Sequence, residues 1–301
     1  MVNDTIISEG GIQFVADGGI VNGIVVSSSG EQVVSSGGLI IGTTVENNGV
    51  LTVLNSGAAT QIIINSGGVE NISSGGLGSD TIINSSGIQN IFGEGSALIT
   101  YVNGGVQNVF GHATSTVINF HGQQNIHNGG LAESTTIDGS AYQFVLSGGI
   151  ASDTSINEWG IQYISQGGVA NDTTINSGGY QRIYSGGVAS STTINAVGEQ
   201  GIRTGGVGIS TTINSGGNQY ISNGGIVRDT TINGGRQTII SGGVASNTTI
   251  NSTGLQTISS GGLAQDTTIN EGGSQSVLPA DKKAEDKPAT PKSPEKEAAA
   301  K

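Results

Sequence analysis

Apolar residues and glycines recur along the chain in one unit of about 19 residues, a period typical of solenoid repeats. Residues 172–190, DTTINSGGYQRIYSGGVAS, show the unit: a β-branched run, a Gly pair, an alternating run, a second Gly pair and a small-residue step. We number the positions of each unit from 0. Units begin at Asp4, Gly23, Gly42, Gln61, Asp80, Ile99, Ser115, Ser134, Asp153, Asp172, Ser191, Ser210, Asp229 and Asn247, with a partial unit from Asp266.

Two units are shorter than the rest. The unit 229–246 loses one residue at its first turn, where NGG replaces NSGG. The unit 99–114 is shorter still, and GHAT replaces its second Gly pair. We therefore expect local irregularities at these two places in an otherwise regular stack.

Three positions of the unit carry aliphatic side chains and predict short strands. The glycine-free runs are too short for a stable helix, whereas β-branched runs bounded by Gly, Ser and Asn are typical of strands. Glycine supplies the positive φ angles that tight corners need. We predict an all-β fold, a parallel β-helix of about 14 rungs with three short faces per rung. The expected core residues are at position 3 (Ile7, Val26, Ile156, Ile175), position 11 (Val15, Val34, Ile164, Ile183) and position 16 (Ile20, Leu39, Leu77, Ile150, Val169, Val188).

Two amide columns accompany the aliphatic ones. Gln occupies position 9 in nearly every unit, and Asn recurs at position 4. Stacked in register, each amide can donate to the one in the next rung and so satisfy both groups. We therefore expect one glutamine ladder, inward or near a corner, and one asparagine ladder at the first corner.

Composition excludes several kinds of partner. The chain has 301 residues, no Cys and a formal net charge of −12, and no Lys or Arg precedes Arg182. Such a surface repels nucleic acid and anionic membranes, and no stretch is apolar enough to span a bilayer. We expect no nucleic-acid partner and no membrane insertion by this segment.

The chain divides into two parts by composition. Residues 1–278 form the predicted β-helix, and residues 279–301, PADKKAEDKPATPKSPEKEAAAK, are predicted to be a disordered or semi-rigid linker. The start, MVNDTI, enters the first repeat at once and is no signal peptide. We expect the chain to be an excised piece of a larger exported protein; the alternative is a free cytoplasmic repeat protein. The final EAAAK also looks like an engineered spacer.

The tandem TTINSGGxQxIxxGGxAS, with Asp or Ser opening the next unit, resembles the passenger repeats of AIDA-type and antigen-43-like self-associating autotransporter adhesins. The resemblance covers nearly all of 4–277. It implies an extracellular right-handed β-helix at the bacterial cell surface that promotes autoaggregation, biofilm formation or host adherence. We expect the signal peptide and membrane anchor of that family to lie outside this sequence.

The resemblance also implies partners. These are identical passenger rods, host surface glycans, and a heptosyltransferase that attaches O-linked heptose to Ser or Thr at corners. The matching serines, each before the second Gly pair, are Ser36, Ser74, Ser147, Ser185, Ser241 and Ser260.

Aromatic residues gather in consecutive units and form a candidate binding patch. Positions 8, 10 and 12 alternate with the core position 11, so side chains there should project outward. Exposed rings beside an arginine can grip a sugar or a partner rod, although stacking between rungs is the simpler alternative. The candidate residues are Tyr142, Phe144, Trp159, Tyr163, Tyr180, Arg182 and Tyr184.

No residue pattern predicts catalysis, a cofactor or a metal. His112, His121 and His127 lie in or beside the irregular unit, but at different corners. Asp recurs regularly at position 0, as a structural corner residue does, and not as a pair at one place. The sequence thus favours a non-enzymatic adhesin rod that associates side to side. The alternatives are a passive spacer for another domain and a polysaccharide-acting enzyme, which would need two carboxylates close together in a groove.

Overall fold

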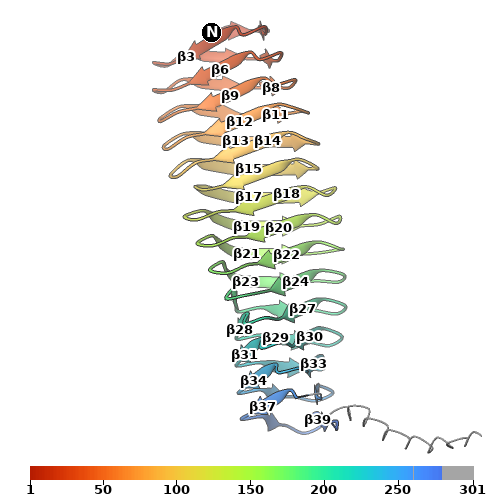
Figure 1. Ribbon diagram of the computed structural model, residues 1–301. Coiled ribbons are helices and arrows are strands. Elements are labelled where there is room, and N and C mark those ends of the chain that lie inside the picture. The colour runs from red at the N-terminus through yellow and green to blue at the C-terminus, as the bar shows by residue number, and fades with distance from the viewer. Residues whose placement is uncertain (260, 280–301) are drawn as a thin grey trace, which may run out of the picture.

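The computed structural model describes residues 1–259 and 261–279, and these form one elongated stack of parallel strands (Figure 1). The chain winds from the first rung to the last without reversing direction. The described residues contain no helix, and so none that could cross a membrane. The last described strand ends at Val277, and the predicted linker lies, apart from Pro279, outside the described residues.

Each rung contributes to two sheets, within the described part of the chain. The second sheet contains one strand of each rung, paired in register with the strands before and after it. Its strands are β3 (Ile12–Val15), β6 (Glu31–Val34), β9 (Val50–Val53), β12 (Val69–Ile72), β14 (Ile88–Ile91), β16 (Val106–Val109), β18 (Gln123–Ile126), β20 (Tyr142–Val145), β22 (Ile161–Ile164), β24 (Tyr180–Ile183), β27 (Glu199–Ile202), β30 (Asn218–Ile221), β33 (Arg236–Ile239), β36 (Leu255–Ile258) and β39 (Ser274–Val277).

The first sheet collects the other two strands of each rung, which meet at a bend. In six rungs the bend is shallow enough for the two strands to join into one of seven or eight residues, as in β13 and β23. Its strands are β1 (Val2–Asn3), β2 (Ile6–Ile7), β4 (Ile20–Asn22), β5 (Val25–Val26), β7 (Leu39–Ile41), β8 (Thr44–Val45), β10 (Ala58–Thr60), β11 (Ile63–Ile64), β13 (Leu77–Asn84), β15 (Ser96–Asn103), β17 (His112–Asn119), β19 (Leu131–Ile137), β21 (Ile150–Ile156), β23 (Val169–Ile175), β25 (Val188–Ser190), β26 (Thr193–Ile194), β28 (Val207–Ile209), β29 (Thr212–Asn214), β31 (Ile226–Arg228), β32 (Thr231–Asn233), β34 (Val244–Ser246), β35 (Thr249–Ile250), β37 (Leu263–Gln265) and β38 (Thr268–Ile269).

Aliphatic side chains stack directly on one another inside the rod, which confirms the parallel β-helix. Ile156 pairs with Ile175, and Ile175 with Ile194, and all three are fully buried. Positions 3 and 11 form continuous buried columns, as predicted. Because every internal strand pairs with a strand of similar pattern on each side, its backbone hydrogen bonds and its buried side chains are satisfied together.

The third predicted column, position 16, is wrong by one residue. Ile150 is 41% exposed, while the next residue, Ala151, is fully buried. The inward position 17 holds Ala or Gly in most rungs and larger side chains at Val21, Ile40 and Val227. Space is limited where the residue is small, since a Cβ added to Gly78 would lie 2.5 Å from Cδ1 of Ile72. The contradicted residues are Ile20, Leu39, Leu77, Ile150, Val169 and Val188, all of which are exposed or half-buried.

The corners depend on left-handed backbone and on close approach. Position 0 has a positive φ in every full unit, from Asp4 (φ 53°) through Gly23 (φ 69°) to Asn247 (φ 54°). In the second turn the first Gly of the pair is left-handed, as in Gly186 (φ 76°). The second Gly is needed for space, since a Cβ on Gly187 would lie 2.6 Å from the Ile164 carbonyl oxygen.

A glutamine ladder runs inside the rod at position 9, as predicted. From Gln107 to Gln275 each Nε2 donates to the glutamine Oε1 of the rung before, at 2.6 to 2.8 Å. Threonines at position 1, also buried, donate to the same acceptors in several rungs, as Thr192 does to Gln181 (3.4 Å). The sequence prediction missed this threonine column.

An asparagine ladder lies at the first corner, again as predicted. Asn176 donates to Asn157, Asn195 to Asn176 and Asn214 to Asn195, each at 2.9 Å. A second such ladder, which was not predicted, stacks Asn71, Asn90, Asn108 and Asn125 on the outer face of the second sheet, at 2.8 to 2.9 Å.

Candidate binding face on the second sheet

The predicted aromatic patch lies on the outer face of the second sheet, across three consecutive strands. Alternation along β20, β22 and β24 buries the glutamine and the aliphatic residue and turns their neighbours outward. In register, Phe144 pairs with Tyr163 and Tyr163 with Arg182. We call Tyr142, Phe144, Trp159, Tyr163, Tyr180, Arg182 and Tyr184 the aromatic ridge.

The rings of the ridge stack on one another from rung to rung. The centroids of Phe144 and Tyr163 are 5.2 Å apart with 10° between the planes, and those of Tyr163 and Tyr184 are 6.5 Å apart. Tyr142 stacks on both Phe144 (6.1 Å) and Tyr163 (6.5 Å). This mutual packing leaves these rings half-buried and holds them in one orientation.

Trp159 marks the edge of the ridge. It occupies a turn position with φ 62°, where the next rung has Gly178, and its side chain is 63% exposed. Its ring lies 6.5 Å from Tyr180 at a tilt of 31°. An exposed indole in left-handed backbone is costly for folding alone, so this residue is a strong candidate for contact with a partner.

Arg182 adds a charge to the ridge. Its guanidinium carbon lies 5.4 Å from the centroid of the Tyr180 ring, and Nη2 lies 3.6 Å from Oε1 of Glu199. This is the one ion pair that the described residues form. Both side chains are partly exposed, so the pair chiefly orients the guanidinium.

The sequence prediction missed a second stack on the same sheet. Phe92 and Phe110 lie 5.9 Å apart, and Phe110 and His127 only 4.1 Å apart with 8° between the rings. Partial burial lowers the pKa of His127, so it stacks as a neutral ring near pH 7. The shortened unit hid this column, because it moves Phe110 to position 11. When the lost turn residue is counted, Phe92, Phe110 and His127 all fall at position 12.

The predicted glycosylation serines lie along one edge of the rod. Ser36, Ser74, Ser147, Ser185 and Ser241 are all exposed in the second turn, and Ser260 lies outside the described residues. The edge borders the ridge, since Ser185 directly follows Tyr184. Ser74 Oγ donates to Oε2 of Glu94 in the next rung at 3.0 Å.

Ionisable groups in the described part of the chain do not gather in a metal-binding cluster. No three or more His, Asp or Glu there lie together as metal ligands would, His112, His121 and His127 included. Burial raises the pKa of Glu70 to about 7, but this carboxyl lies inside the rod, where its partners are Gln89 and Thr81. It cannot reach a substrate.

Two comparisons with known proteins identify similar sequences and structures. The family described as "Adhesin of bacterial autotransporter system, probable stalk" matches residues 139–198 and 156–217, a region that contains the whole ridge. No curated protein sequence gives a match. Among solved structures, the crystal structure of a TibC-catalysed, hyper-glycosylated TibA fragment is similar, with a TM-score of 0.78 and 37% identity, covering 92% of this chain and 96% of that one.

The identity over nearly the whole length of both chains, the shared fold and the family match agree with the repeat pattern. The chain belongs to the AIDA-type autotransporter adhesins and is a β-helical adhesin passenger.

Proposed function

We propose that the rod mediates bacterial self-association at the cell surface, through side-to-side contact between identical rods along the aromatic ridge. The observation that carries this proposal is the ridge itself: six rings and one guanidinium spread over three rungs and fixed by stacking. A preorganised surface loses little conformational entropy when it binds. Many rods on one cell then act together, so weak single contacts suffice.

A role as an adhesin, and not as an enzyme, is supported by the family. The ridge offers apolar faces and one arginine, which suit the burial of a partner surface. A polysaccharide-acting enzyme needs two carboxylates facing one groove. The carboxyl with the largest pKa shift is instead enclosed in the core.

Sugar attachment would complement this contact. We infer that a glycosyltransferase modifies the exposed serines of the second turn, Ser36, Ser74, Ser147, Ser185, Ser241 and Ser260. The five that the structure describes are accessible in tight turns, and the similar TibA fragment is hyper-glycosylated. Sugars on this edge would frame the ridge and add polar contacts at its rim. Adherence to host cells is the other role expected of this family, and the aromatic ridge would serve as the contact face for it as well.

The test removes the ridge without touching the core. In the full chain, Tyr142, Trp159, Tyr163 and Tyr180 are changed to Ser together, and self-association is measured by sedimentation velocity and by settling of cells that display the rod. We expect at least a tenfold loss of association. The matched control changes Phe92 and Phe110 to Ser in the second stack, and should leave association unchanged. A ridge variant with an intact β-sheet spectrum and normal association would show that the rod is only a spacer.

A further inference from the structure

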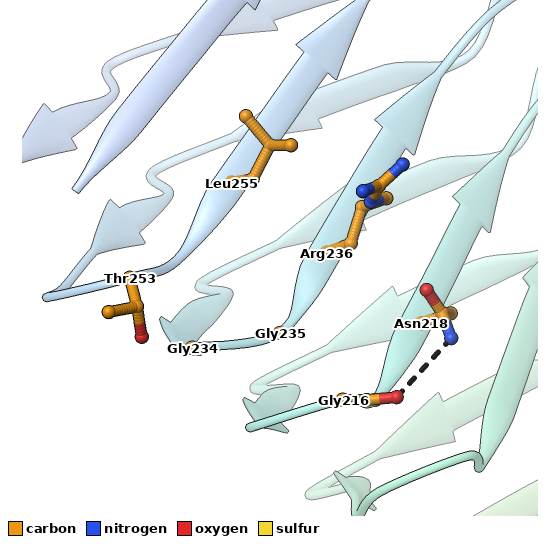
Figure 2. A pocket seen from close by; sticks show the side chains of 8 residues that line it. Gly216, Asn218, Gly234, Gly235, Arg236, Thr253 and Leu255 are labelled. Atoms are coloured by element: carbon orange, nitrogen blue, oxygen red, sulfur yellow. Dashed lines mark hydrogen bonds between the residues drawn. The ribbon is translucent and has the colours of Figure 1, made fainter.

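A notch opens where the unit 229–246 lacks its turn residue (Figure 2). It measures about 310 Å³ and lies between the first turns of three consecutive rungs. Asn214 and Gly234 form an isolated bridge there instead of the regular turn. The groups that line it and carry the argument are Gly216, Asn218, Gly234, Arg236, Thr253 and Leu255. We call this the Gly234 notch.

A short ladder of corner hydrogen bonds ends beside the notch. The same bond is also absent at Ser29 and Ser140 in regular units of the described chain, so the ladder is intermittent along the rod. The Trp159 amide donates to the Gly178 carbonyl (2.9 Å), Gly178 to Val197 (3.3 Å) and Val197 to Gly216 (3.0 Å). The ladder resumes only where Thr253 donates to Gly272 (2.8 Å). In the described part of the chain, no carbonyl accepts from the Gly216 amide, so this donor is left open to a ligand.

Arg236 stands at the mouth of the notch, at the start of β33, and is exposed. On its column of the second sheet the neighbours are Asn218 and Leu255, neither of which is charged. The acid of that column, Glu199, is two rungs away and pairs with Arg182 at 3.6 Å. Figure 2 shows Arg236 standing between Asn218 and Leu255, with Asn218 bonded to the Gly216 carbonyl (3.4 Å).

The chain contains a second loss of the same turn residue, which serves as an internal comparison. At Asn103 and Gly104 the sequence is again NGG. There the Gly104 amide donates to the Asn119 carbonyl (3.2 Å), whereas its counterpart Gly234 has no such bond within the described residues. The amide of Ser86, the counterpart of Gly216, is likewise without a carbonyl partner among the described residues, so the two places are alike in this respect. The counterpart of Arg236 there is Val106. A Cβ on Gly104 would meet the Phe120 carbonyl at 3.2 Å. Loss of the residue alone therefore does not make a polar, charged recess.

We propose that the Gly234 notch binds a carboxylate-bearing sugar, such as a uronic acid unit of an acidic polysaccharide. Arg236 pairs with the sugar carboxylate in the two-pronged geometry that guanidinium favours. The Gly216 amide, the Asn218 amide and the Thr253 hydroxyl bond ring hydroxyls, and Leu255 packs on the C–H face. The volume lies at the small end of ligand sites, as a single sugar ring requires.

An acidic side chain of a second rod is the competing occupant. Its carboxylate would satisfy Arg236, but its slim aliphatic stem would leave the glycine-walled recess and its open backbone donor unfilled. A polyhydroxylated ring uses both. The sugar is therefore the better match.

The test titrates the whole chain with D-glucuronate and D-glucose, observed by saturation-transfer NMR. We expect glucuronate to bind with a Kd on the order of 1 mM and at least about tenfold more tightly than glucose. Arg236→Gln should remove this preference, and Arg203→Gln, which changes an exposed arginine elsewhere, should not.

An insertion variant distinguishes the contribution of the notch to binding from that of the Arg236 charge. Placing Ser between Asn233 and Gly234 restores NSGG, keeps Arg236 and should abolish glucuronate binding. The same insertion between Asn103 and Gly104 should leave binding intact. Equal binding of both sugars, or unchanged binding after the first insertion, would overturn the proposal. So would loss of rod self-association in Arg236→Gln without any sugar binding, which would assign the notch to a second rod. Self-association along the ridge is unaffected by either result.

Discussion

The buried polar column differs between the two ends of the rod. From Gln89 onward every rung contributes an amide, and each is bonded to the one before it. Nearer the N-terminus the column reads Gln13, Gln32, Leu51 and Glu70, and the bonds stop after Gln32 Nε2 donates to Gln13 Oε1 (2.8 Å). The column of buried amides can therefore be interrupted, as it is at Leu51 and Glu70.

At the interruption, apolar residues replace both the buried glutamine and the threonine that would donate to it. In several rungs a position 1 hydroxyl donates to the glutamine of the rung before, as Thr43 does to Gln32 (3.1 Å). Beside Leu51 the corresponding residue is Ile62, so an apolar pair replaces a bonded pair. Glu70 then begins the long ladder by accepting from Gln89 (2.7 Å), while its Oε1 has no partner. At Leu51 the glutamine and its threonine partner are thus both replaced by apolar residues, which leaves neither polar group without the other.

The largest expected effect comes from breaking the continuous ladder. Gln181→Ala removes one acceptor and one donor, leaving Gln162 Oε1 and Gln200 Nε2 without their 2.7 Å bonds, and opens a cavity. We expect unfolding free energy to fall by about 3–5 kcal/mol, measured by urea denaturation. Ser190→Ala is the control, since it removes one hydrogen bond on the outer side of the rod, from Ser190 Oγ to Asn171 Oδ1 (2.7 Å), and nothing from the core. A loss below about 1 kcal/mol would mean that the ladder does not hold the rungs together.

The second largest effect is expected on the pH dependence of the unfolding free energy, and it comes from Glu70 at the interrupted end of the column. Burial raises the pKa of Glu70 from 4.5 to about 7, so the folded rod binds more protons than the unfolded chain between these values. Stability is therefore fully present below pH 4.5 and falls as pH rises to about 7, by about 3 kcal/mol in total at 1.36 kcal/mol per unit.

Glu70→Gln isolates this effect. The variant should be about 3 kcal/mol more stable than the parent at pH 8 and nearly equal to it at pH 4.5, in urea unfolding followed by circular dichroism. Glu133→Gln, at an exposed site, should keep the parent's pH profile. If the parent shows no decline above pH 5, Glu70 is not the buried acid described above.

The smallest effect is expected from repairing the gap. Leu51→Gln in the Glu70→Gln background makes the amide column continuous from Gln13 onward. Two new hydrogen bonds, about 1 kcal/mol each, offset the roughly 2 kcal/mol lost with the leucine. We expect stability within about 1 kcal/mol of the single variant. A much larger loss would show that Ile62 has to change as well.

The repeat predicted most of this architecture because its signal is periodic. The stacking of Ile156 on Ile175, the inward glutamines and the asparagine corner all followed from residues that recur at one position. The third column was misplaced because small Ala and Gly at position 17 give a weaker hydrophobic signal than the exposed Ile and Val beside them.

The candidate site was predictable only in part. Strand alternation sufficed to turn Tyr163 and Tyr180 outward. The stack of Phe110 on His127 and the Gly234 notch both lie at shortened units, where counting positions fails. Such places depend on the three-dimensional closure of neighbouring turns, which no single unit encodes.

Strict alternation has a consequence for how such a rod can diversify. Side chains that point inward contact the equivalent residues of the rungs above and below, so a substitution at one of them also destabilises its neighbours. Those that point outward also stack on their neighbours in places, but solvent on one side leaves room for other side chains there. One lineage can therefore exchange tyrosines for threonines on its flank, and so acquire a new attachment preference, without rebuilding the scaffold beneath.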